Sequence, residues 1–497
     1  MRAAALLTSA LTCAALLAGC TSEKDTPPAP TPAPSPATGS PSTSPTASAS
    51  GPSNGPSDGA TGDAADGYST PVEDRNYPDV GDPGVDALHY DLDLTWRPAT
   101  RTLEGVETLE LRATEDADHL QLDLARPLEV EKVLLDGAPA DHRHRGKDLV
   151  VEADVATDEL HTLVITYAGR PRPVPAPVQR SDFDSTGWTV THDGATWTMQ
   201  EPYGAYTWYA VNDQPSDKAL YDFTLRVPAP FVGVANGALL ERSRADGDTV
   251  TRWRLDSPAS SYLITVAFDD FTMTEDTAKS GIPLTYWTPR GRPDLLRRVE
   301  RTPEALDWVE QHLGPYPFDT LGIVVVDSQS GMETQTMITL GDTAYATSPE
   351  VLVHEIAHQW YGDEVTPIDW RDVWMNEGMA TFVQGVWTAE SQGEPVSAVM
   401  DRWAELEPRL RAEAGPPAAY DPDAFGSSNV YYGPALMWDD LRQRLGDAEF
   451  WRLAAAWPRA YAEGNADYNK ITTWWTEHSG EDLTAFFAAW LLGETTP

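Results

Sequence analysis

Cysteine is almost absent from this sequence: its two examples, Cys13 and Cys20, both lie within the first twenty residues. The folded part of the chain therefore cannot hold a disulfide bond. Long apolar runs are absent after the N-terminus, so no later segment is predicted to span a membrane. Basic residues are few, with 35 Lys and Arg against 77 Asp and Glu, and the net charge is −42. Such a chain repels phosphate backbones and anionic headgroups, so we expect neither nucleic acid nor anionic lipid as a ligand.

The N-terminus carries the pattern of an export signal. Met1-Arg2 precedes an apolar run from Ala3 to Ala18, which predicts a signal peptide too short to span a membrane stably. The run ends in L-A-G-C at positions 17–20, which resembles a bacterial lipoprotein signal. Cleavage after residues 1–19 would leave a lipidated Cys20, whose acyl chains would anchor the exported protein to the outer face of the cell membrane. An ordinary secretory signal with an incidental Cys20 is the alternative.

The composition then changes twice, which predicts three further segments. Residues 20–75 are rich in Pro, Ser, Thr, Ala and Gly with hardly a large apolar side chain, so we expect a disordered tether. Residues 76–273 contain short runs that alternate apolar and polar with period two, as in Leu88–Trp96, separated by turns with Gly, Pro and Asp, and these runs predict an all-β domain. Further strands are predicted at residues 120–124, 148–152, 163–167, 221–227, 249–255 and 262–268.

Residues 274–497 mix one strong strand pattern with several helical ones. An amphipathic helix is predicted over Asp294–Leu313, and a buried strand over Leu321–Asp327. Later helices are predicted at residues 434–445, 448–461, 471–477 and 483–492. This order predicts a domain that is mixed α/β at its start and helical afterwards.

One helix of this domain has the spacing of a metal site. Val351–Gly362 is apolar, has no internal Pro and contains His354-Glu355-x-x-His358. Residues four apart project from one helical face, so the two imidazoles can reach one Zn²⁺ at roughly 2.0–2.1 Å. Glu355, beside the first ligand, can reach a water on the metal without being a ligand itself.

A catalytic zinc ion needs a third protein ligand and keeps one open position. The candidate is Glu377, which follows His358 after eighteen residues within W-M-N-E-G. Burying Asn376 and Glu377 in an apolar helix start is costly unless a partner such as a metal compensates. The alternative is a fortuitous H-E-x-x-H match, but the apolar setting and the second carboxylate favour one zinc ion per chain.

These motifs resemble the gluzincin zinc aminopeptidase family, of which aminopeptidase N is the familiar member. The shared pattern is H-E-x-x-H, eighteen residues and a Glu within W-x-N-E-G, and S-G-M-E-T at Ser330–Thr334 is similar to that family's G-A-M-E-N. The resemblance covers the chain from about Pro83 to Leu492. It implies a saddle-like N-terminal β domain, a thermolysin-like catalytic domain, and a short bacterial lipoprotein form. Many relatives carry a further C-terminal domain over the cleft, so a more open site is expected here.

The same resemblance implies the roles of several other residues. Gly331 and Met332 belong to an edge that pairs with the substrate backbone, and Glu333 holds its free N-terminus. Glu201, in T-M-Q-E-P, would help to bind the same ammonium group. Tyr431, in N-V-Y-Y-G-P, matches the tyrosine that supports catalysis. Tyr432 is the alternative if the register shifts by one, and for each residue a purely structural role also stands.

Four positions depart from the family pattern. Met199 replaces a Gln two residues before Glu201, and Thr334 replaces the Asn of G-A-M-E-N. Gln384 stands where an acidic residue often follows the third ligand by seven positions, so weaker metal binding is expected. Gly433-Pro434 replaces a basic residue and a glycine.

The resulting hypothesis is a zinc aminopeptidase that acts on peptides with a free N-terminus, with Glu355 as general base. Three alternatives stay open: a zinc endopeptidase with the same ligands, a hydrolase of a small non-peptide molecule, and a surface-tethered binding protein with a relic site. The first two alternatives would use the same zinc chemistry. The third is supported by the four positions that depart from the family pattern. A lipid anchor is the only expected contact with the membrane.

Overall fold

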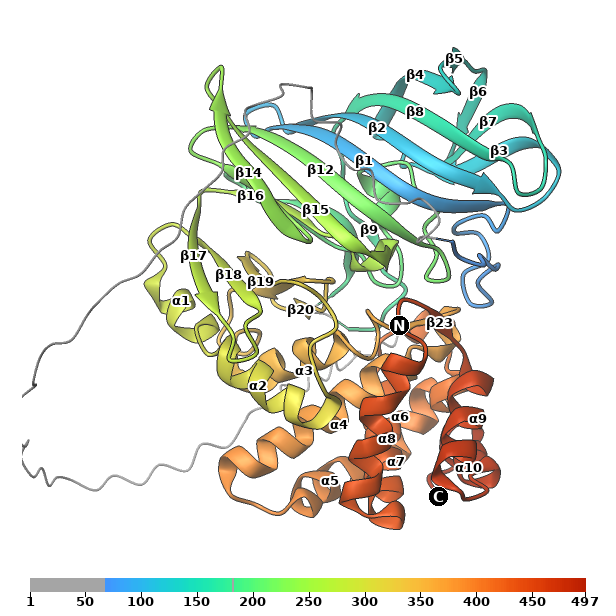
Figure 1. Ribbon diagram of the computed structural model, residues 1–497, viewed down its shortest axis with the longest axis vertical. Helices are drawn as coiled ribbons and strands as arrows, with labels where there is room; N and C mark the ends of the chain where they lie inside the picture. Colours follow the sequence, from blue (N-terminus) through green and yellow to red (C-terminus); the bar gives the residue numbers. More distant parts are fainter. Residues whose placement is uncertain (1–67, 181–182) are drawn as a thin grey trace, which may run out of the picture. The chain divides into compact units, whose positions relative to one another are not determined.

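A computed structural model describes residues 68–180 and 183–497 (Figure 1). The predicted signal peptide, the lipidation site at Cys20 and the tether up to residue 67 lie outside the described residues and stay predictions. Within the described part, a sheet-rich domain is followed by a helix-rich one, which confirms the expected order.

The first domain is built on an eight-stranded sheet in which β1 and β12 are the parallel neighbours at the centre. Alternate side chains of β1 are buried, among them Tyr90, Leu92, Leu94 and Trp96, as the period-two pattern predicted. In spatial order the sheet consists of β14 (Ala238–Ala245), β15 (Asp248–Ser260), β12 (Lys218–Pro228), β1 (Val85–Arg97), β2 (Thr102–Ala113), β8 (Leu160–Gly169), β4 (Leu128–Leu135) and β5 (Ala138–Pro139).

Two smaller sheets complete this domain. One contains β13 (Val232–Ala235), β16 (Val266–Asp269), β11 (Thr196–Met199), β10 (Ser185–Val190) and β9 (Val174–Pro175); the other contains β3 (Ala117–Asp123), β7 (Asp148–Val155) and β6 (His142–Arg145). The strand predicted over residues 262–268 was wrong in its first half. Ser261–Leu263 forms a short 3-10 helix, and Tyr262 turns inward, where its hydroxyl donates to the carbonyl of Gly362 at 3.1 Å.

The end of the predicted tether is also packed on the folded body. The Ser69 amide donates to Asp86 at 3.0 Å, and Asp74 accepts from the Trp370 amide at 2.7 Å. Residues 68–75 therefore belong to the fold and not to the tether, because these polar contacts compensate for their scarcity of apolar side chains. This corrects the C-terminal limit of the predicted tether.

A second five-stranded sheet opens the helix-rich domain. Its spatial order is β17 (Phe271–Thr277), β18 (Pro283–Pro289), β19 (Leu321–Val326), β21 (Met337–Gly341) and β20 (Gly331–Met332). Every residue of β19 is buried, as expected for a strand with parallel neighbours on both sides. The short strand β20 forms the edge of this sheet, so one side of its backbone has no partner strand among the described residues.

Helices make up most of the rest of this domain: α1 (Pro293–Val299), α2 (Thr302–Leu313), α3 (Pro349–His358), α4 (Trp374–Gln392), α5 (Val396–Ala404), α6 (Glu407–Ala414), α7 (Asn429–Leu445), α8 (Asp447–Ala460), α9 (Tyr468–Ser479) and α10 (Thr484–Leu492). The single helix predicted over Asp294–Leu313 was wrong, because the chain breaks at Glu300-Arg301 and starts again with Thr302-Pro303 as a new first turn. A two-stranded link, β22 (Thr366–Pro367) with β23 (Asn465–Ala466), joins the loop after α3 to the loop before α9.

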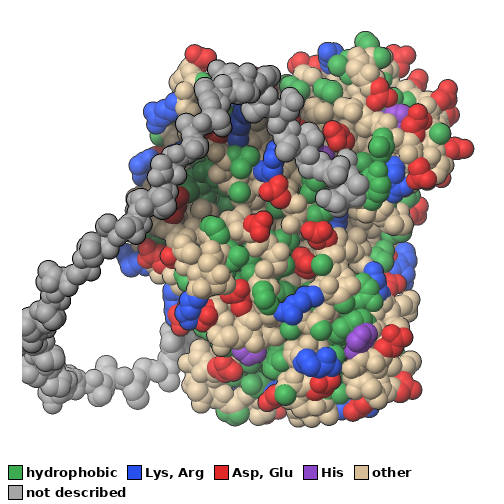
Figure 2. Space-filling view, in the orientation of Figure 1, with side chains coloured by type: hydrophobic (Ala, Val, Ile, Leu, Met, Phe, Trp, Pro, Cys, Tyr) green, Lys and Arg blue, Asp and Glu red, His purple; other side chains and the backbone are tan. Residues whose placement is uncertain are grey.

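The described surface agrees with an acidic, solvated protein. Figure 2 shows Asp and Glu side chains scattered over the visible face of the molecule, with Lys and Arg between them. No helix in the described ranges combines the length and the apolar character needed to cross a bilayer.

The close crossing of α4 and α7 depends on Gly378. A Cβ built at this glycine would lie 2.3 Å from the Cβ of Pro434. The two helices therefore pack so closely at this point that there is no room for a side chain at position 378. We expect Gly378→Ala to lower the free energy of unfolding by about 1–3 kcal/mol, because the helices must separate. Ser391→Ala, on an exposed part of α4, is the matched control. Denaturant unfolding of both variants measures the difference, and equal stabilities would contradict this account of the crossing.

Candidate metal centre

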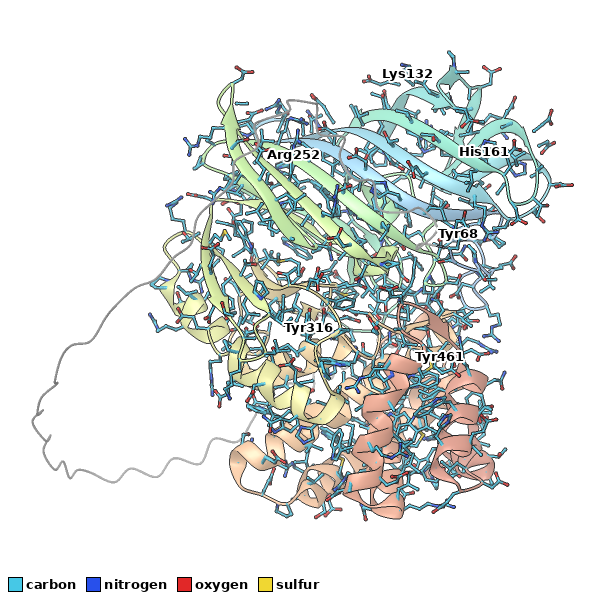
Figure 3. All side chains as sticks on the ribbon, in the orientation of Figure 1. Tyr68, Lys132, His161, Arg252, Tyr316 and Tyr461 are labelled. Atoms are coloured by element: carbon cyan, nitrogen blue, oxygen red, sulfur yellow. The ribbon has the colours of Figure 1, made fainter. Side chains whose placement is uncertain are left out.

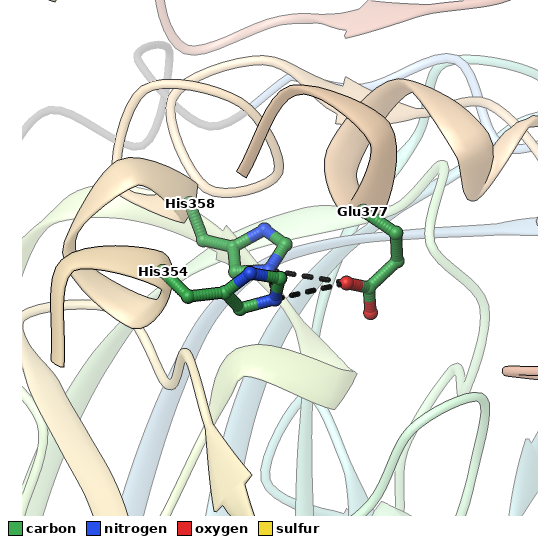
Figure 4. Close-up of side chains that lie close together, drawn as sticks. All are labelled: His354, His358 and Glu377. Carbon is green, nitrogen blue, oxygen red and sulfur yellow. Dashed lines mark hydrogen bonds and ion pairs between the residues drawn. The ribbon is translucent and has the colours of Figure 1, made fainter. Parts of the chain in front are cut away.

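Helix α3 supplies the first two predicted ligands. Ser348 caps the helix by accepting a hydrogen bond from the Val351 amide at 3.3 Å, and Pro349 occupies its first turn. The helix is buried from Val351 to its end at His358, so both imidazoles lie inside the protein. Helix α4 lies beside α3 and presents Glu377 from its first turn (Figure 4).

The structure brings His354, His358 and Glu377 together. The two Nε2 atoms are 3.1 Å apart, and Glu377 Oε2 lies 3.2 Å from His354 Nε2 and 3.4 Å from His358 Nε2. Three ligands of a tetrahedral zinc ion, each at about 2.0–2.1 Å, lie about 3.3 Å from one another. The three atoms therefore form a triangle of the size that a zinc ion requires.

The hydrogen bonding of His358 also fits a metal ligand. Its Nδ1 lies 3.1 Å from the carbonyl oxygen of Tyr361, which can only accept, so Nδ1 carries a hydrogen. The neutral ring then has a lone pair on Nε2, the atom that faces the triangle. Such a backbone contact orients the ring of a metal-binding histidine.

Two other groups of donor atoms in this region are also compact enough for an ion: Glu333, Glu355 and His358, and Glu201, Glu333 and Glu377. Both groups consist mainly or entirely of carboxylates, which suit harder cations better than zinc. Two imidazoles with one carboxylate are the donor set of a catalytic zinc site, so the residues present fit this metal.

The electrostatics show how strongly this buried group attracts positive charge. Burial by itself lowers the pKa of His358, but the carboxylates of Glu333 and Glu377 raise it well above its usual value. Burial acts to raise the pKa of Glu377, yet the imidazoles of His358 and His354 hold it well below the usual range. Burial and the nearby Glu333 raise the pKa of Glu355 well above that of an ordinary carboxyl group. A divalent cation would supply the charge that these carboxylates lack.

Glu355 lies against the edge strand of the second sheet. A Cβ built at Gly331 would lie 2.5 Å from Glu355 Oε1. Any residue other than glycine at position 331 would therefore clash with the Glu355 carboxylate in its present position. Gly331 and Met332 form β20, whose outer side is the free edge of the sheet. The predicted substrate-pairing edge and the predicted base therefore lie side by side.

Glu201 and Glu333 reach the same space from the two domains. Both side chains are buried, at 7% and 3% exposure, and the Oε1 atom of each has no hydrogen-bond partner among the described residues. One oxygen of each lies within 4.8 Å of the other and of Glu377. Buried carboxylate oxygens without partners are costly, and a cationic ligand between them would remove that cost.

Tyr431, and not Tyr432, contacts the metal-binding group. The hydroxyl of Tyr431 donates to Glu377 Oε1 at 2.9 Å, whereas Tyr432 stacks on Trp403 with ring centroids 5.3 Å apart. Helix α7 begins at Asn429, five residues earlier than the predicted start at Pro434, so Tyr431 lies in its first turn.

The four departures from the family pattern have different surroundings. Met199 is fully buried, with its sulfur 3.8 Å from the Ser328 hydroxyl, and it does not line the cleft. Thr334 hydrogen-bonds to the Met337 carbonyl and to Thr339, which ties the loop after Glu333 together. Neither side chain lines the cleft, and both make contacts within the surrounding protein.

Gln384 lines the cleft beside His354, and burial lowers the pKa of this imidazole, whereas a side-chain hydrogen bond between the two acts to raise it. Position 433 is crowded, since a Cβ there would lie 3.1 Å from Pro417 Cγ and 3.4 Å from a guanidinium nitrogen of Arg411. That guanidinium occupies the space that a basic side chain would need.

Two contributors were missed at the level of sequence. Gln359, at the C-terminal end of α3, donates to the Glu333 carbonyl at 2.9 Å and accepts from the Tyr316 hydroxyl at 3.1 Å. It therefore links α3 to the loop that carries Glu333. Figure 3 labels Tyr316 within the second domain. Arg180, from the first domain, donates to the Tyr431 hydroxyl at 3.2 Å. A buried polar residue directly after H-E-x-x-H could have indicated Gln359, but nothing in the sequence around Arg180 marks it.

The three predicted zinc ligands, Glu201, Glu333, Glu355, Tyr431 and Arg180 line one cleft with a volume of about 420 Å³. Its lining includes all the residues of the predicted site from both domains, together with aromatic side chains at its rim such as Phe183 and Tyr345. This size accommodates a ligand of a few residues.

Family models match both domains of the chain. The model described as the peptidase M1 N-terminal domain matches residues 86–263, and the peptidase family M1 domain matches residues 297–490. Together the two matches cover the β domain and the domain that holds the metal-binding group.

Individual proteins with known names show the same similarity. Aminopeptidase N of Streptomyces lividans is 24% identical over 447 residues, which are 82% of this chain and 50% of that protein. Aminopeptidase M1 of Arabidopsis thaliana is 24% identical over 61% of this chain and 38% of its own length. The chain thus spans half or less of the length of these curated relatives.

A solved structure of similar size exists. The M1 zinc metallopeptidase of Deinococcus radiodurans is 26% identical, with a TM-score of 0.77 over 86% of this chain and 98% of that one. A mutant of it has been solved with a bound Tyr-Ser-Ala substrate.

Proposed function

Because this chain belongs to the peptidase M1 family, we propose that it is a zinc aminopeptidase, which removes residues one at a time from the free N-terminus of peptides. The observation that carries this proposal is the pair of buried carboxylates of Glu201 and Glu333 beside the metal-binding triangle, whose Oε1 atoms have no hydrogen-bond partner among the residues that the structure describes. An endopeptidase has no use for such a pair, because its substrate carries no ammonium group at that place.

His354, His358 and Glu377 would hold the zinc ion in this function. A bound zinc ion supplies Lewis acidity, which lowers the pKa of a water molecule and polarises a carbonyl group. The other steps belong to side chains of this protein.

Glu355 acts as the general base and then as the general acid. It accepts the proton of the attacking water and returns it to the nitrogen of the leaving peptide. Its buried position beside Gly331 places this carboxyl group where it can hold the proton between the two transfers. The Tyr431 hydroxyl donates a hydrogen bond to the carbonyl oxygen as negative charge develops on it.

Glu333 and Glu201 bind the ammonium group of the substrate. Their oxygens lie close to Glu377 but belong to other segments, so they can hold the amine while the first peptide bond faces Glu355. The N-terminal amine and the first peptide bond of the substrate are separated by one residue. Binding of the amine by Glu333 and Glu201 therefore restricts cleavage to the first peptide bond. The edge of β20 is free to pair with the backbone of the bound peptide.

The test compares aminoacyl fluorogenic amides with their N-acetylated forms, with and without added zinc. We expect hydrolysis of the free amines alone, and we expect Glu333→Gln to lower kcat/KM by about 100-fold because a buried charge loses its partner. Glu350→Gln, on the first turn of α3 and outside the cleft, is the control. Equal cleavage of acetylated and free substrates would instead support an endopeptidase. An absence of hydrolysis under every condition would contradict the proposed function.

A further inference from the structure

Arg180 brings a positive charge into a cleft that is otherwise acidic. Four carboxylates line this cleft, those of Glu201, Glu333, Glu355 and Glu377, and Arg180 is the sole Lys or Arg among the described lining residues. It comes from the first domain, directly before residues 181–182, whereas the catalytic groups lie mainly in the second. Its position is therefore a feature of the domain arrangement and not of either domain alone.

The contact between Arg180 and Tyr431 has a defined direction. Nη1 of Arg180 lies 3.2 Å from the Tyr431 hydroxyl oxygen and 3.5 Å from the carbonyl oxygen of Gly426. A guanidinium group can only donate, so the tyrosine oxygen must accept from Arg180. The single hydroxyl hydrogen of Tyr431 then points elsewhere, and it meets Glu377 Oε1 at 2.9 Å.

We propose that Arg180 is a positioning residue for the reaction: it occupies the lone pair of the Tyr431 hydroxyl and thereby aims its hydrogen at the metal-binding group. This inference rests on the proposed function. Because Arg180 holds the lone pair, the same hydrogen stays directed toward the metal-binding triangle, where it can turn from Glu377 Oε1 to the carbonyl oxygen of a bound substrate. A hydrogen bond accepted from a cation also polarises the hydroxyl, which strengthens the bond that it donates.

The position of the guanidinium over the ring supports this role. Its central carbon lies 6.0 Å from the centroid of the Tyr431 ring, and the same Nη1 that contacts the tyrosine hydroxyl also donates to the Gly426 carbonyl. The charge of Arg180 therefore stands close to the oxygen that would stabilise the developing oxyanion. Preorganised charge of this kind lowers the barrier without needing to move during the reaction.

A different role for the same residue is the binding of a substrate carboxylate. A guanidinium in an acidic cleft could pair with the C-terminus of a di- or tripeptide, since Arg recognises carboxylates well. The observed contact to Tyr431 favours the positioning role, because it is directed to a predicted catalytic group. Substrates with and without a carboxylate separate the two roles.

The experiment is a double-mutant cycle on the zinc-loaded full chain. Arg180→Gln is made in the natural sequence and in a Tyr431→Phe background, and each protein is assayed on an aminoacyl amide and on a dipeptide with the same first residue. We expect Arg180→Gln to lower kcat by about 10- to 100-fold with little change in KM on both substrates, somewhat less than the loss of a direct oxyanion donor. In the Tyr431→Phe background the same change should lower kcat less than 3-fold, because the residue acts through the hydroxyl.

Two further variants complete the design. Arg180→Lys retains a cationic donor and should recover a large part of the lost kcat, whereas Arg172→Gln, an exposed arginine on the same segment, should behave as the natural protein. Bound zinc and melting temperature are measured for each variant, and we expect no change in either.

Several results would overturn the inference. Equal losses in both backgrounds, or a raised KM for the dipeptide alone, would show that Arg180 binds substrate directly. Unchanged kcat in Arg180→Gln would show that it has no role in the reaction. An inactive natural protein would instead count against the proposed aminopeptidase function, so the two failures are distinguishable.

Discussion

Glu355→Gln is expected to lower kcat for aminoacyl-amide hydrolysis by about 100- to 10,000-fold while the bound zinc stays the same. The amide has nearly the same shape as the carboxyl group but cannot accept the proton of the attacking water. Glu355 is 6% exposed and lies against Gly331, so the substitution fits without new space. The measurements are steady-state kinetics and metal content by mass spectrometry.

The matched control is Glu350→Gln, which makes the same change on the same helix but outside the cleft. It should retain the natural kcat. A Glu355→Gln protein that keeps both its zinc and its activity would rule out this residue as the base, and a variant that loses its zinc would show that Glu355 acts on the metal site.

Removal of the metal is expected to abolish hydrolysis and to lower the melting temperature, and added zinc should restore both. Without an ion, burial and the neighbouring carboxylates raise the pKa values of Glu201, Glu333 and Glu355, which shows that the metal-free site is unfavourable for their charged forms. An ion that binds only the folded protein stabilises it by about 2.7 kcal/mol when the free zinc concentration is 100 times its Kd. Thermal unfolding with chelator and with graded zinc measures this directly.

Histidine substitutions make the thermal test specific. His358→Ala should remove the dependence of the melting temperature on zinc, because it deletes one corner of the triangle. His161→Ala removes another buried histidine, which lies in β8 and pairs with Asp136 at 2.9 Å, and should retain that dependence. Figure 3 labels His161 in the first domain, far in sequence from the metal-binding residues. If both variants responded to zinc alike, the predicted ligand set would be wrong.

The sequence was informative where a short periodic pattern controls the geometry. The spacing of His354 and His358 requires both rings to share one face of a helix, whatever the rest of the fold does. In the same way, the alternation in Leu88–Trp96 predicted the buried face of β1. The chain break at Glu300-Arg301 shows the limit of this reasoning, since an amphipathic pattern continues across two helices as readily as along one.

The choice between Tyr431 and Tyr432 shows a second limit. Both tyrosines stand in the same short motif, and adjacent residues on a helix differ by about 100° in direction. Which of them faces Glu377 depends on where α7 starts and how it crosses α4, and that crossing depends on the close contact of Gly378 with Pro434. No local pattern carries this information.

By itself, the sequence determined the order of a sheet-rich and a helix-rich domain, the pair of histidines on one helical turn and the carboxylate, that of Glu377, that lies beside them, because local periodicity and a compact return of the chain govern these features. Tertiary structure alone decided that Arg180 of one domain contacts Tyr431 of the other and that Gln359 connects the loop carrying Glu333 to α3. It also decided that the edge strand β20 lies beside Glu355. The physical reason is that these contacts join segments far apart in the chain, and their distances depend on the packing of whole helices and sheets.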